Sequence, residues 1–130
     1  MQLLERKTVL GRGKYGKIMG FSEATRVGKF VYVAGHNAHN ENGEITTIDS
    51  YEQTVIAIKN VERALREAGS SLQDVVKTRV YVGPSTDWRA VQKAHREFFG
   101  KVKPCSTFLF TNFFSDPRLM VEVEAEALVE

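Results

Sequence analysis

The sequence has one cysteine and no long apolar run, and both scarcities limit what the protein can be. Cys105 has no second cysteine to pair with, which excludes an internal disulfide and agrees with a reducing compartment. The apolar stretches fall short of the roughly 18 residues that a membrane-spanning helix needs. No contiguous apolar segment follows the first basic residues, which argues against a secretory signal. We therefore expect a cytoplasmic protein with no membrane partner.

A strong charge imbalance is also lacking, because the formal net charge of +2 is too small to suggest a partner. The distribution is nevertheless uneven, with seven cationic and two anionic side chains in residues 1–29 and only acids between 119 and 129. The basic residues are not interleaved with aromatic ones, as a groove for single-stranded nucleic acid would need. A solvated or intersubunit surface is the favoured interpretation, and nucleic acid is not an expected partner.

The length of 130 residues suits a single domain, 1–130, whose basic segment 1–17 is expected to be loop-like. Within that segment, Gly11-Arg12-Gly13-Lys14-Tyr15-Gly16 matches the G-x-G-x-x-G pattern of dinucleotide-binding turns. That chemistry needs a buried strand before the glycines and a helix after them. The flanking residues show neither pattern, so we interpret the motif as a turn or flexible loop and expect no cofactor.

Two histidines lie three residues apart in a polar segment after a strand-like run. His36 and His39 would need two further ligands to form a zinc site, and Cys105 is the one candidate that the sequence offers. Loop histidines without a metal are the favoured interpretation, and no metal site is expected.

The carboxyl-terminal quarter has the clearest pattern. Between 119 and 129, apolar and acidic residues alternate with a period of two, which predicts a strand buried on one face: Val121, Val123, Ala125 and Ala127 against Glu122, Glu124 and Glu126. The run from Ser106 to Phe113 is apolar on both faces and is expected inside the sheet. Ser115-Asp116-Pro117 between the two runs predicts a turn, and hence a β-hairpin.

Other elements follow from periodicity and capping residues. Strands are expected at 30–34 and 75–82, and helices after Asp49-Ser50 and after Ser85-Thr86-Asp87. Ser50 and Gln53 have the spacing of a capping box, and Gly69 and Gly100 are expected to end the helices.

His95 falls on the apolar face of the second predicted helix. A lone histidine there is more often a hydrogen-bonded packing residue than a catalyst, so packing is the favoured interpretation.

The order of elements predicts an α+β sandwich with two helices on one face of a single mixed sheet. The aromatic residues of the chain cannot all lie under two helices. We therefore expect a closed oligomer that buries the other face.

Landmarks in the same order resemble those of the Rid proteins, the reactive intermediate deaminases, also called YjgF-like and formerly L-PSP endoribonucleases. The similar segments are Phe21-Ser22-Glu23-Ala24, Val33-Ala34-Gly35, Gln53-Thr54, Asn60, Ala68-Gly69-Ser70-Ser71, Phe98-Phe99, Pro104 and Val121-Glu122-Val123-Glu124-Ala125. The resemblance implies a chorismate-mutase-like fold that assembles as a homotrimer, with small-molecule pockets at the interfaces between subunits.

The resemblance also implies a site and a departure from it. In the well-studied branch, an arginine after the proline grips a substrate carboxylate, and a glutamate helps to position the water that hydrolyses a 2-imino acid. The glutamate matches Glu122, whereas the arginine position falls on Ser106. Other implied pocket positions that differ from the usual residues are Phe21, Ala34, His36 and Gln92. The chain therefore resembles an arginine-lacking branch, and ordinary deamination of 2-iminobutanoate or 2-iminopropanoate is not expected.

We expect the functional site where the cluster Cys105-Ser106-Thr107 meets Glu122. One hypothesis is a hydrolase or deaminase acting on an imine or enamine, with Glu122 as acid or base and the hydroxyls of Ser106 and Thr107 holding the substrate. Cys105, activated by His36, is an alternative catalytic group. A metabolite-binding trimer without turnover and an RNA-binding or endoribonuclease protein remain open as well, so enzymatic activity itself is left undecided.

Overall fold

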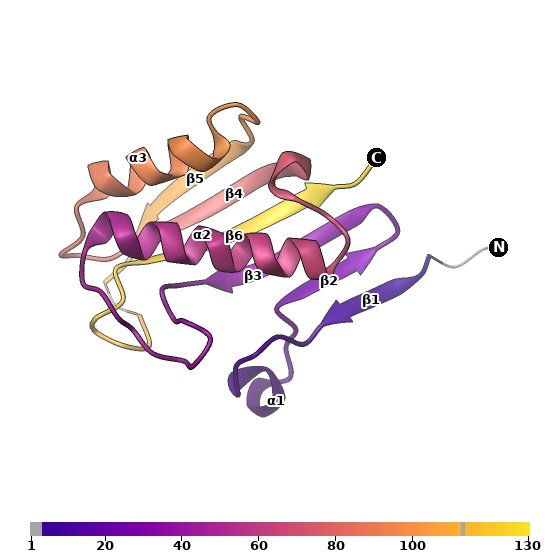
Figure 1. Ribbon diagram of the computed structural model, residues 1–130, viewed down its shortest axis with the longest axis horizontal. Coiled ribbons are helices and arrows are strands. Elements are labelled where there is room, and N and C mark those ends of the chain that lie inside the picture. The colour runs from indigo at the N-terminus through magenta and orange to yellow at the C-terminus, as the bar shows by residue number, and fades with distance from the viewer. Residues whose placement is uncertain (1–3, 113) are drawn as a thin grey trace.

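A computed structural model describes residues 4–112 and 114–130 (Figure 1). The strands are β1 Arg6–Val9, β2 Ala24–Val27, β3 Phe30–His36, β4 Val75–Val82, β5 Cys105–Phe110 and β6 Val121–Leu128. The helices are α1 Tyr15–Met19, α2 Ser50–Glu67 and α3 Trp88–Phe99, and a short 3-10 turn spans Leu72–Asp74. The predicted strands at 30–34 and 75–82 and the two longer helices are confirmed.

The strands form one mixed sheet in the order β1-β2-β3-β6-β4-β5. β4 and β5 are parallel, and α3 makes the crossover between them, as parallel neighbours require. The remaining neighbours are antiparallel, and β6 pairs with β3 on one side and β4 on the other. The last strand in chain order is therefore central in the sheet.

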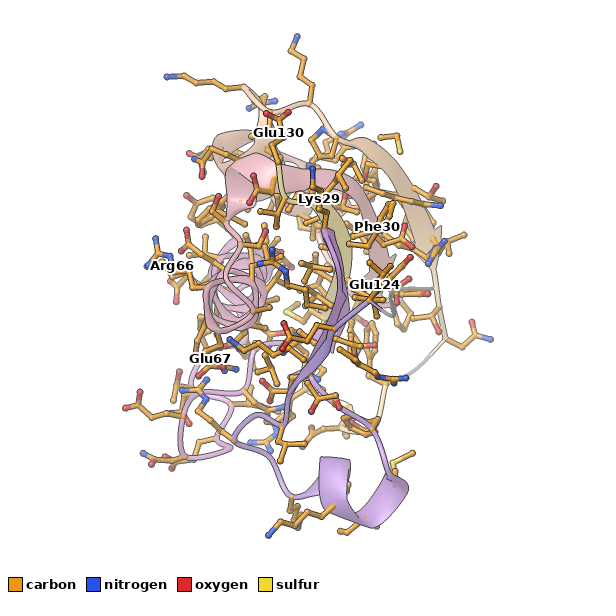
Figure 2. All side chains as sticks on the ribbon, turned by 90° about the vertical axis from the view of Figure 1, so that its right-hand side faces the viewer. Lys29, Phe30, Arg66, Glu67, Glu124 and Glu130 are labelled. Atoms are coloured by element: carbon orange, nitrogen blue, oxygen red, sulfur yellow. The ribbon has the colours of Figure 1, made fainter. Side chains whose placement is uncertain are left out.

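Both long helices cover the same face of the sheet, which confirms the predicted α+β sandwich (Figures 1 and 2). Residues of β6 that were predicted to be apolar and buried lie under these helices: Val121, Val123, Ala125 and Ala127. The core beneath α2 and α3 also contains Leu65 and Phe99. Figure 2 shows the sheet edge-on, with Glu124 and Phe30 on the side away from α2. That side of the sheet has no helix over it, so side chains such as Phe30 and Tyr32 are about half exposed.

The start of α2 differs from the capping box predicted from Ser50 and Gln53. Asp49 is the N-cap, and its carboxylate accepts a hydrogen bond from the backbone N–H of Glu52. The Gln53 side chain is fully buried and bonds to other loops, because tertiary partners compete with the local cap. For α3 the capping prediction is confirmed, since the Asp87 carboxylate accepts from the backbone N–H groups of Arg89 and Ala90.

The predicted carboxyl-terminal hairpin is wrong. β4 lies between β5 and β6, so the two strands are not neighbours, and β5 is an edge strand rather than an interior one. Leu109 and Phe110 on β5 are accordingly 41% and 68% exposed. The turn residues at 115–117 are a local signal, whereas the pairing is decided by hydrogen bonds to strands far away in sequence. The predicted first strand also included Phe113, which lies outside the described residues.

The amino-terminal segment is more structured than the loop expected for 1–17. β1 is an edge strand that pairs antiparallel with β2, which satisfies the backbone groups on one side of it despite its polar sequence. The G-x-G-x-x-G residues follow β1 and lead into the five-residue α1, so a strand and a short helix do flank the motif. Residues 1–3 of that segment lie outside the described residues.

Within the described ranges, none of the helices combines the length and the apolar character that crossing a bilayer requires.

Candidate functional site

Glu122 lies on β6, on the sheet face that the helices leave open, at the point where β6 runs beside the end of β3. Burial raises the pKa of its carboxyl group above the ordinary value, and the nearby charge of Glu124 acts in the same direction. Asn37 and His36 oppose this shift only in part. A carboxyl group with a raised pKa keeps its proton to a higher pH than an ordinary one, which favours a role as general acid or base.

Gly35 is the residue that lets the Glu122 carboxylate fit against β3. A Cβ atom at position 35 would lie 2.6 Å from Oε2 of Glu122, closer than such atoms approach one another. The backbone is not in the left-handed region here, so glycine is required by close approach and not by its conformation. The sequence signal for this contact is a glycine within a strand pattern.

A hollow of about 580 Å³ opens beside this end of β3, between the loop around Gly11–Gly16 and α2. Three of the predicted substrate-binding residues line it: Phe21, Ala34 and His36. Phe21 is 44% exposed, whereas His36 is buried and belongs to β3 instead of the polar loop expected for it. Asn37, His39 and Asn60 add polar groups to the same wall.

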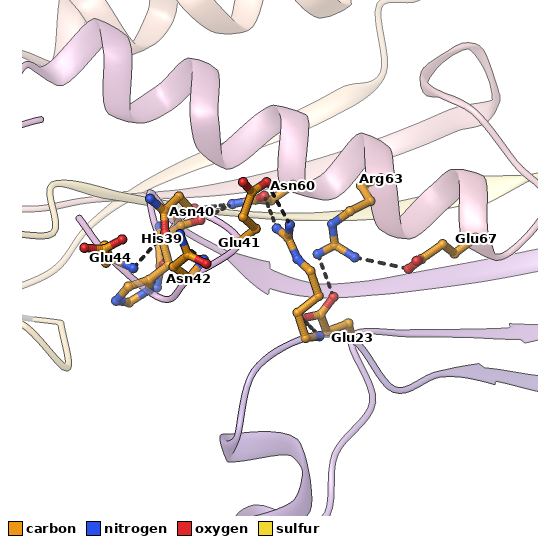
Figure 3. A network of polar contacts seen from close by, with 11 residues as sticks. Glu23, His39, Asn40, Glu41, Asn42, Glu44, Asn60, Arg63 and Glu67 are labelled. Carbon is orange, nitrogen blue, oxygen red and sulfur yellow. Dashed lines mark hydrogen bonds and ion pairs between the residues drawn. The ribbon is translucent and has the colours of Figure 1, made fainter. Parts of the chain in front are cut away.

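Glu23 links residues that line the hollow and come from different elements (Figure 3). Its carboxylate accepts a hydrogen bond from Arg63 of α2 at 2.8 Å and from the backbone N–H of Arg12 at 3.3 Å. Nε2 of His36 lies 3.4 Å from the same carboxylate. His36 and Arg63 together hold the pKa of Glu23 down at about 2. Nδ1 of His36 carries a hydrogen, because it bonds to the carbonyl oxygen of Ala34, which can only accept. The contact fixes His36 in place, away from Cys105 on β5.

Replacing Glu23 with glutamine is expected to lower the free energy of unfolding at pH 7 by about 1 to 2 kcal/mol, since the side chain is partly screened by solvent. The folded-state pKa lies below the unfolded value, so the stabilisation is present above pH 4.5 and is lost as the pH falls towards 2. Urea unfolding of both proteins at several pH values measures the difference.

Glu67→Gln is the matched control, because Glu67 also pairs with Arg63 but is half exposed. We expect it to cost less than about 0.5 kcal/mol at any pH. A difference between Glu23→Gln and wild type that stays constant down to pH 2 would contradict the assignment.

The second group of predicted residues lies at the β5 edge of the sheet. Ser106 Oγ is 2.6 Å from Oγ1 of Thr78 on β4, and Thr78 Oγ1 is 2.9 Å from Nε2 of His95 on α3. The register pairs Thr78 with Ser106, so both side chains are on the helix-covered side of the sheet. The His95 ring packs against Phe99 and Phe108, with ring centroids 4.8 and 5.5 Å away. Burial lowers the pKa of His95 below its ordinary 6.5.

The other predicted residues of this edge are exposed. Cys105 and Thr107 alternate with Ser106 along β5 and therefore belong to the open face of the sheet. The Cys105 thiol donates to the carbonyl oxygen of Val76 at 3.2 Å. Gln92 is one turn before His95 on α3.

The structure thus divides the predicted site into two groups. Phe21, Ala34 and His36 line the hollow beside the end of β3, and Glu122 lies against Gly35 at that end of the strand. Ser106, Cys105 and Thr107 lie on β5, and Gln92 lies on α3. Within one chain β4 separates them, so Ser106 and Glu122 do not meet there. Arg79 pairs with Glu124, and Arg118 pairs with Asp116, so these two cations already have carboxylate partners.

Sequence reasoning missed the buried hydroxyl of Thr78, whereas the prediction of His95 as a hydrogen-bonded packing residue agrees with its contacts to Thr78, Phe99 and Phe108. The available signal was a threonine on the same strand face as Val80 and Val82, where a polar group needs a partner. Glu23 and Arg63 were also missed as supports of His36. The zinc hypothesis finds no support in the described part of the chain, where no three histidine, cysteine or acidic side chains gather.

Comparison with known proteins shows the family to which the chain and its fold belong. The family model described as Endoribonuclease L-PSP matches residues 14–129. A RutC family protein of Pyrococcus abyssi, PYRAB12510, is 36% identical over 126 residues, which is 95% of this chain and 98% of that protein. The crystal structure of Rv2704 from Mycobacterium tuberculosis, a member of the YjgF/YER057c/UK114 family, has a TM-score of 0.87 at 35% identity and covers 96% of this chain and 100% of its own.

A more distant relative has a named activity. The 3-aminoacrylate deaminase RutC of Acinetobacter baylyi is 24% identical over 102 residues, or 78% of this chain and 81% of that protein.

These matches identify the class of protein as a small α+β sandwich of the YjgF type. The chain belongs to the Rid, or YjgF-like, family, as the resemblance of its sequence predicted.

Proposed function

We propose that this chain forms a homotrimer with a pocket between neighbouring copies, in which a small imine or enamine is hydrolysed. An enamine first takes up a proton on its β-carbon and loses one from nitrogen, which gives the imine. Water adds to the carbon of the C=N bond, the nitrogen takes up a proton, and ammonia leaves as the carbonyl product forms. Glu122 of one copy removes a proton from the water and returns it to the leaving nitrogen. Ser106, Thr107 and Gln92 of the neighbouring copy hold the substrate.

The observation that carries the proposal is the Glu122 carboxyl group, whose pKa is raised by burial beside Gly35 and Asn37. An acid on the open face of an antiparallel strand is ordinarily solvated, whereas Glu122 is half-buried within one chain, as are Glu124 and Glu126 on the same face. The activity for which the Acinetobacter relative is named, deamination of the enamine 3-aminoacrylate, is chemistry that such a group supports.

The assembly follows from the same geometry. One sheet face has no helix over it and carries Phe30, Tyr32 and Leu128 at 38% exposure or more. Contact between copies through this face would bury these side chains and bring β5 of one copy towards β6 of the next. A pocket completed in this way would unite the two groups of site residues that one chain keeps apart.

Ser106 argues against the usual 2-imino acid substrates. An arginine binds a carboxylate through two charged hydrogen bonds, whereas a serine offers one neutral hydrogen bond. Cys105 is the alternative nucleophile, but its thiol donates to a backbone carbonyl and has no base among its described contacts.

The test is ammonia release from imines generated freshly by an amino-acid oxidase and from 3-aminoacrylate. We expect acceleration above buffer for at least one substrate, and a loss of about a hundredfold in Glu122→Gln, the size typical of a lost general acid or base. Glu62→Gln is the control, because Glu62 is a partly buried acid on α2 that pairs with Arg66. The sample should have three times the 14.6 kDa mass of one chain by light scattering.

Absence of acceleration for every imine and enamine would overturn the hydrolase. Thermal stabilisation by a metabolite that is recovered unchanged would then favour a binding protein. A monomeric mass would remove the pocket itself.

A further inference from the structure

The hydrogen-bonded chain from Ser106 to His95 determines what kind of ligand group the β5 edge can receive. It begins at the exposed Ser106 hydroxyl, passes through the fully buried Thr78 hydroxyl and ends at Nε2 of His95. Its two links, of 2.6 and 2.9 Å, are both within hydrogen-bonding distance. The buried Thr78 hydroxyl therefore links the His95 imidazole to the surface through two hydrogen bonds.

Each hydroxyl has a single hydrogen, so the directions of the two links are coupled. When Nε2 of His95 is unprotonated, Thr78 donates to it and must accept from Ser106. Ser106 has then used its hydrogen inwards and presents only lone pairs to a ligand. When Nε2 carries a hydrogen, Thr78 accepts from it, which leaves the Thr78 hydrogen free to point to Ser106 and the Ser106 hydrogen free to point outwards.

A neutral imidazole favours the first arrangement once a donor is bound. The ring lies against Phe99 and Phe108, and burial lowers its pKa, so it is uncharged at neutral pH. A ligand N–H that donates to Ser106 starts a chain of aligned hydrogen bonds that ends on a basic nitrogen, and such bonds strengthen one another. A carboxylate at the same place would face the lone pairs of Ser106, which repel its negative charge.

We propose that the Ser106–Thr78–His95 hydrogen bonds make this end of the pocket a hydrogen-bond acceptor. The ligand then carries an amide or amine N–H where 2-imino acids carry a carboxylate. The inference rests on the proposed function, because it takes Ser106 as a pocket residue. Thr78 and His95 act through Ser106 and are positioning residues.

The pH dependence has a definite sign. Below the lowered pKa of His95, the ring carries hydrogens on both nitrogens, Thr78 accepts from Nε2, and the Ser106 hydrogen is free to donate to a ligand. Affinity for an N–H ligand then falls and affinity for a carboxylate rises. The side chains that contact the ring are Thr78, Phe99 and Phe108, which do not ionise near neutral pH. Charged and titratable neighbours in sequence on the three elements are Lys77 and Arg79 on the open face of β4, Cys105 on the open face of β5, and the exposed Arg96 on α3.

The experiment compares the affinities of 2-oxobutanamide and 2-oxobutanoate, which have the same shape and differ in an NH₂ group against a charged oxygen. Titration followed by calorimetry or by the ¹⁵N signals of His95 measures both. For the wild-type protein at pH 7.5 we expect the amide to bind about tenfold more tightly, the effect of one hydrogen bond. At pH 5 this preference should shrink or reverse.

Thr78→Val keeps the shape of the side chain and removes the central hydroxyl. We expect it to abolish both the amide preference and its pH dependence, whereas Thr25→Val on β2 leaves them unchanged. Ser106→Ala, at an exposed position, serves the same purpose if Thr78→Val does not fold. Ser106→Arg should reverse the preference in favour of the carboxylate.

The outcomes separate this inference from the proposed function. An amide preference that requires Thr78, without ammonia release, supports the role of the Ser106–Thr78–His95 hydrogen bonds and rejects the proposed hydrolase activity. Ammonia release combined with an equal or stronger affinity for the carboxylate at pH 7.5 rejects the role of the Ser106–Thr78–His95 hydrogen bonds and leaves the proposed hydrolase activity standing. Unchanged preference in Thr78→Val, or no saturable binding of either compound, also rejects the role of these hydrogen bonds.

Discussion

Truncating Phe99 to alanine is expected to lower the free energy of unfolding by about 3 to 5 kcal/mol. Phe99 is 2% exposed and closes the core between α3 and the sheet, so its loss leaves a cavity that the rigid surroundings fill only in part. The ring also packs against His95, with 4.8 Å between centroids. Urea unfolding followed by circular dichroism measures the change.

Phe98→Ala is the matched control for this prediction. Phe98 is the preceding residue on α3 and is only partly buried against the core. We expect it to cost less than half as much as Phe99→Ala. Equal losses for the two variants would show that the cavity beneath α3 does not determine the cost.

Replacing Gln53 with leucine is expected to lower the free energy of unfolding by about 3 kcal/mol, because three backbone groups lose their partner. The fully buried amide donates to the carbonyl oxygens of Thr47 and Arg118 at 2.8 and 2.9 Å. Its oxygen accepts from the backbone N–H of Met120 at 2.9 Å. A leucine of similar volume fills the space but satisfies none of these groups.

The same variant should also affect the site. Met120 is two residues before Glu122, so Gln53 fixes the path along which the chain enters β6. If the proposed hydrolysis is observed, we expect Gln53→Leu to reduce kcat/KM at temperatures where the protein is still folded. Gln73→Leu, at an exposed position, is the control for both measurements. A stability within 0.5 kcal/mol of wild type, about the size of an ordinary surface substitution, would contradict the role assigned to Gln53.

The sequence predicted most of the fold where a local pattern determined the structure. The alternation from Val121 to Ala127 survives in β6, because an antiparallel strand with one covered face requires a period of two. Asp87 and Gly100 mark the ends of α3 because capping is also local. The hairpin failed because partner choice depends on residues that are distant in sequence, and no property of 115–117 reveals that β4 intervenes.

For the candidate site too, the sequence predicted residues within local patterns but not the contacts between distant segments. Glu122 could be found from its strand and from the family resemblance, whereas its contact with Gly35 depends on the register between β3 and β6. Thr78 is separated from His95 by 17 residues and from Ser106 by 28, so only the assembled sheet brings the three together. His95 was interpreted as a packing residue, and its contacts with Phe99 and Phe108 agree with that role as well.

The central place of β6 has a consequence for how the molecule is made. During synthesis β1, β2 and β3 can pair among themselves, and β4 can pair with β5, but the strand that joins the two halves emerges after all of them. Until then both halves expose an unpaired strand edge, a state that favours association with other chains. Completion of the sheet must therefore follow translation of its final strand, and that interval is when a nascent molecule most needs protection by a chaperone.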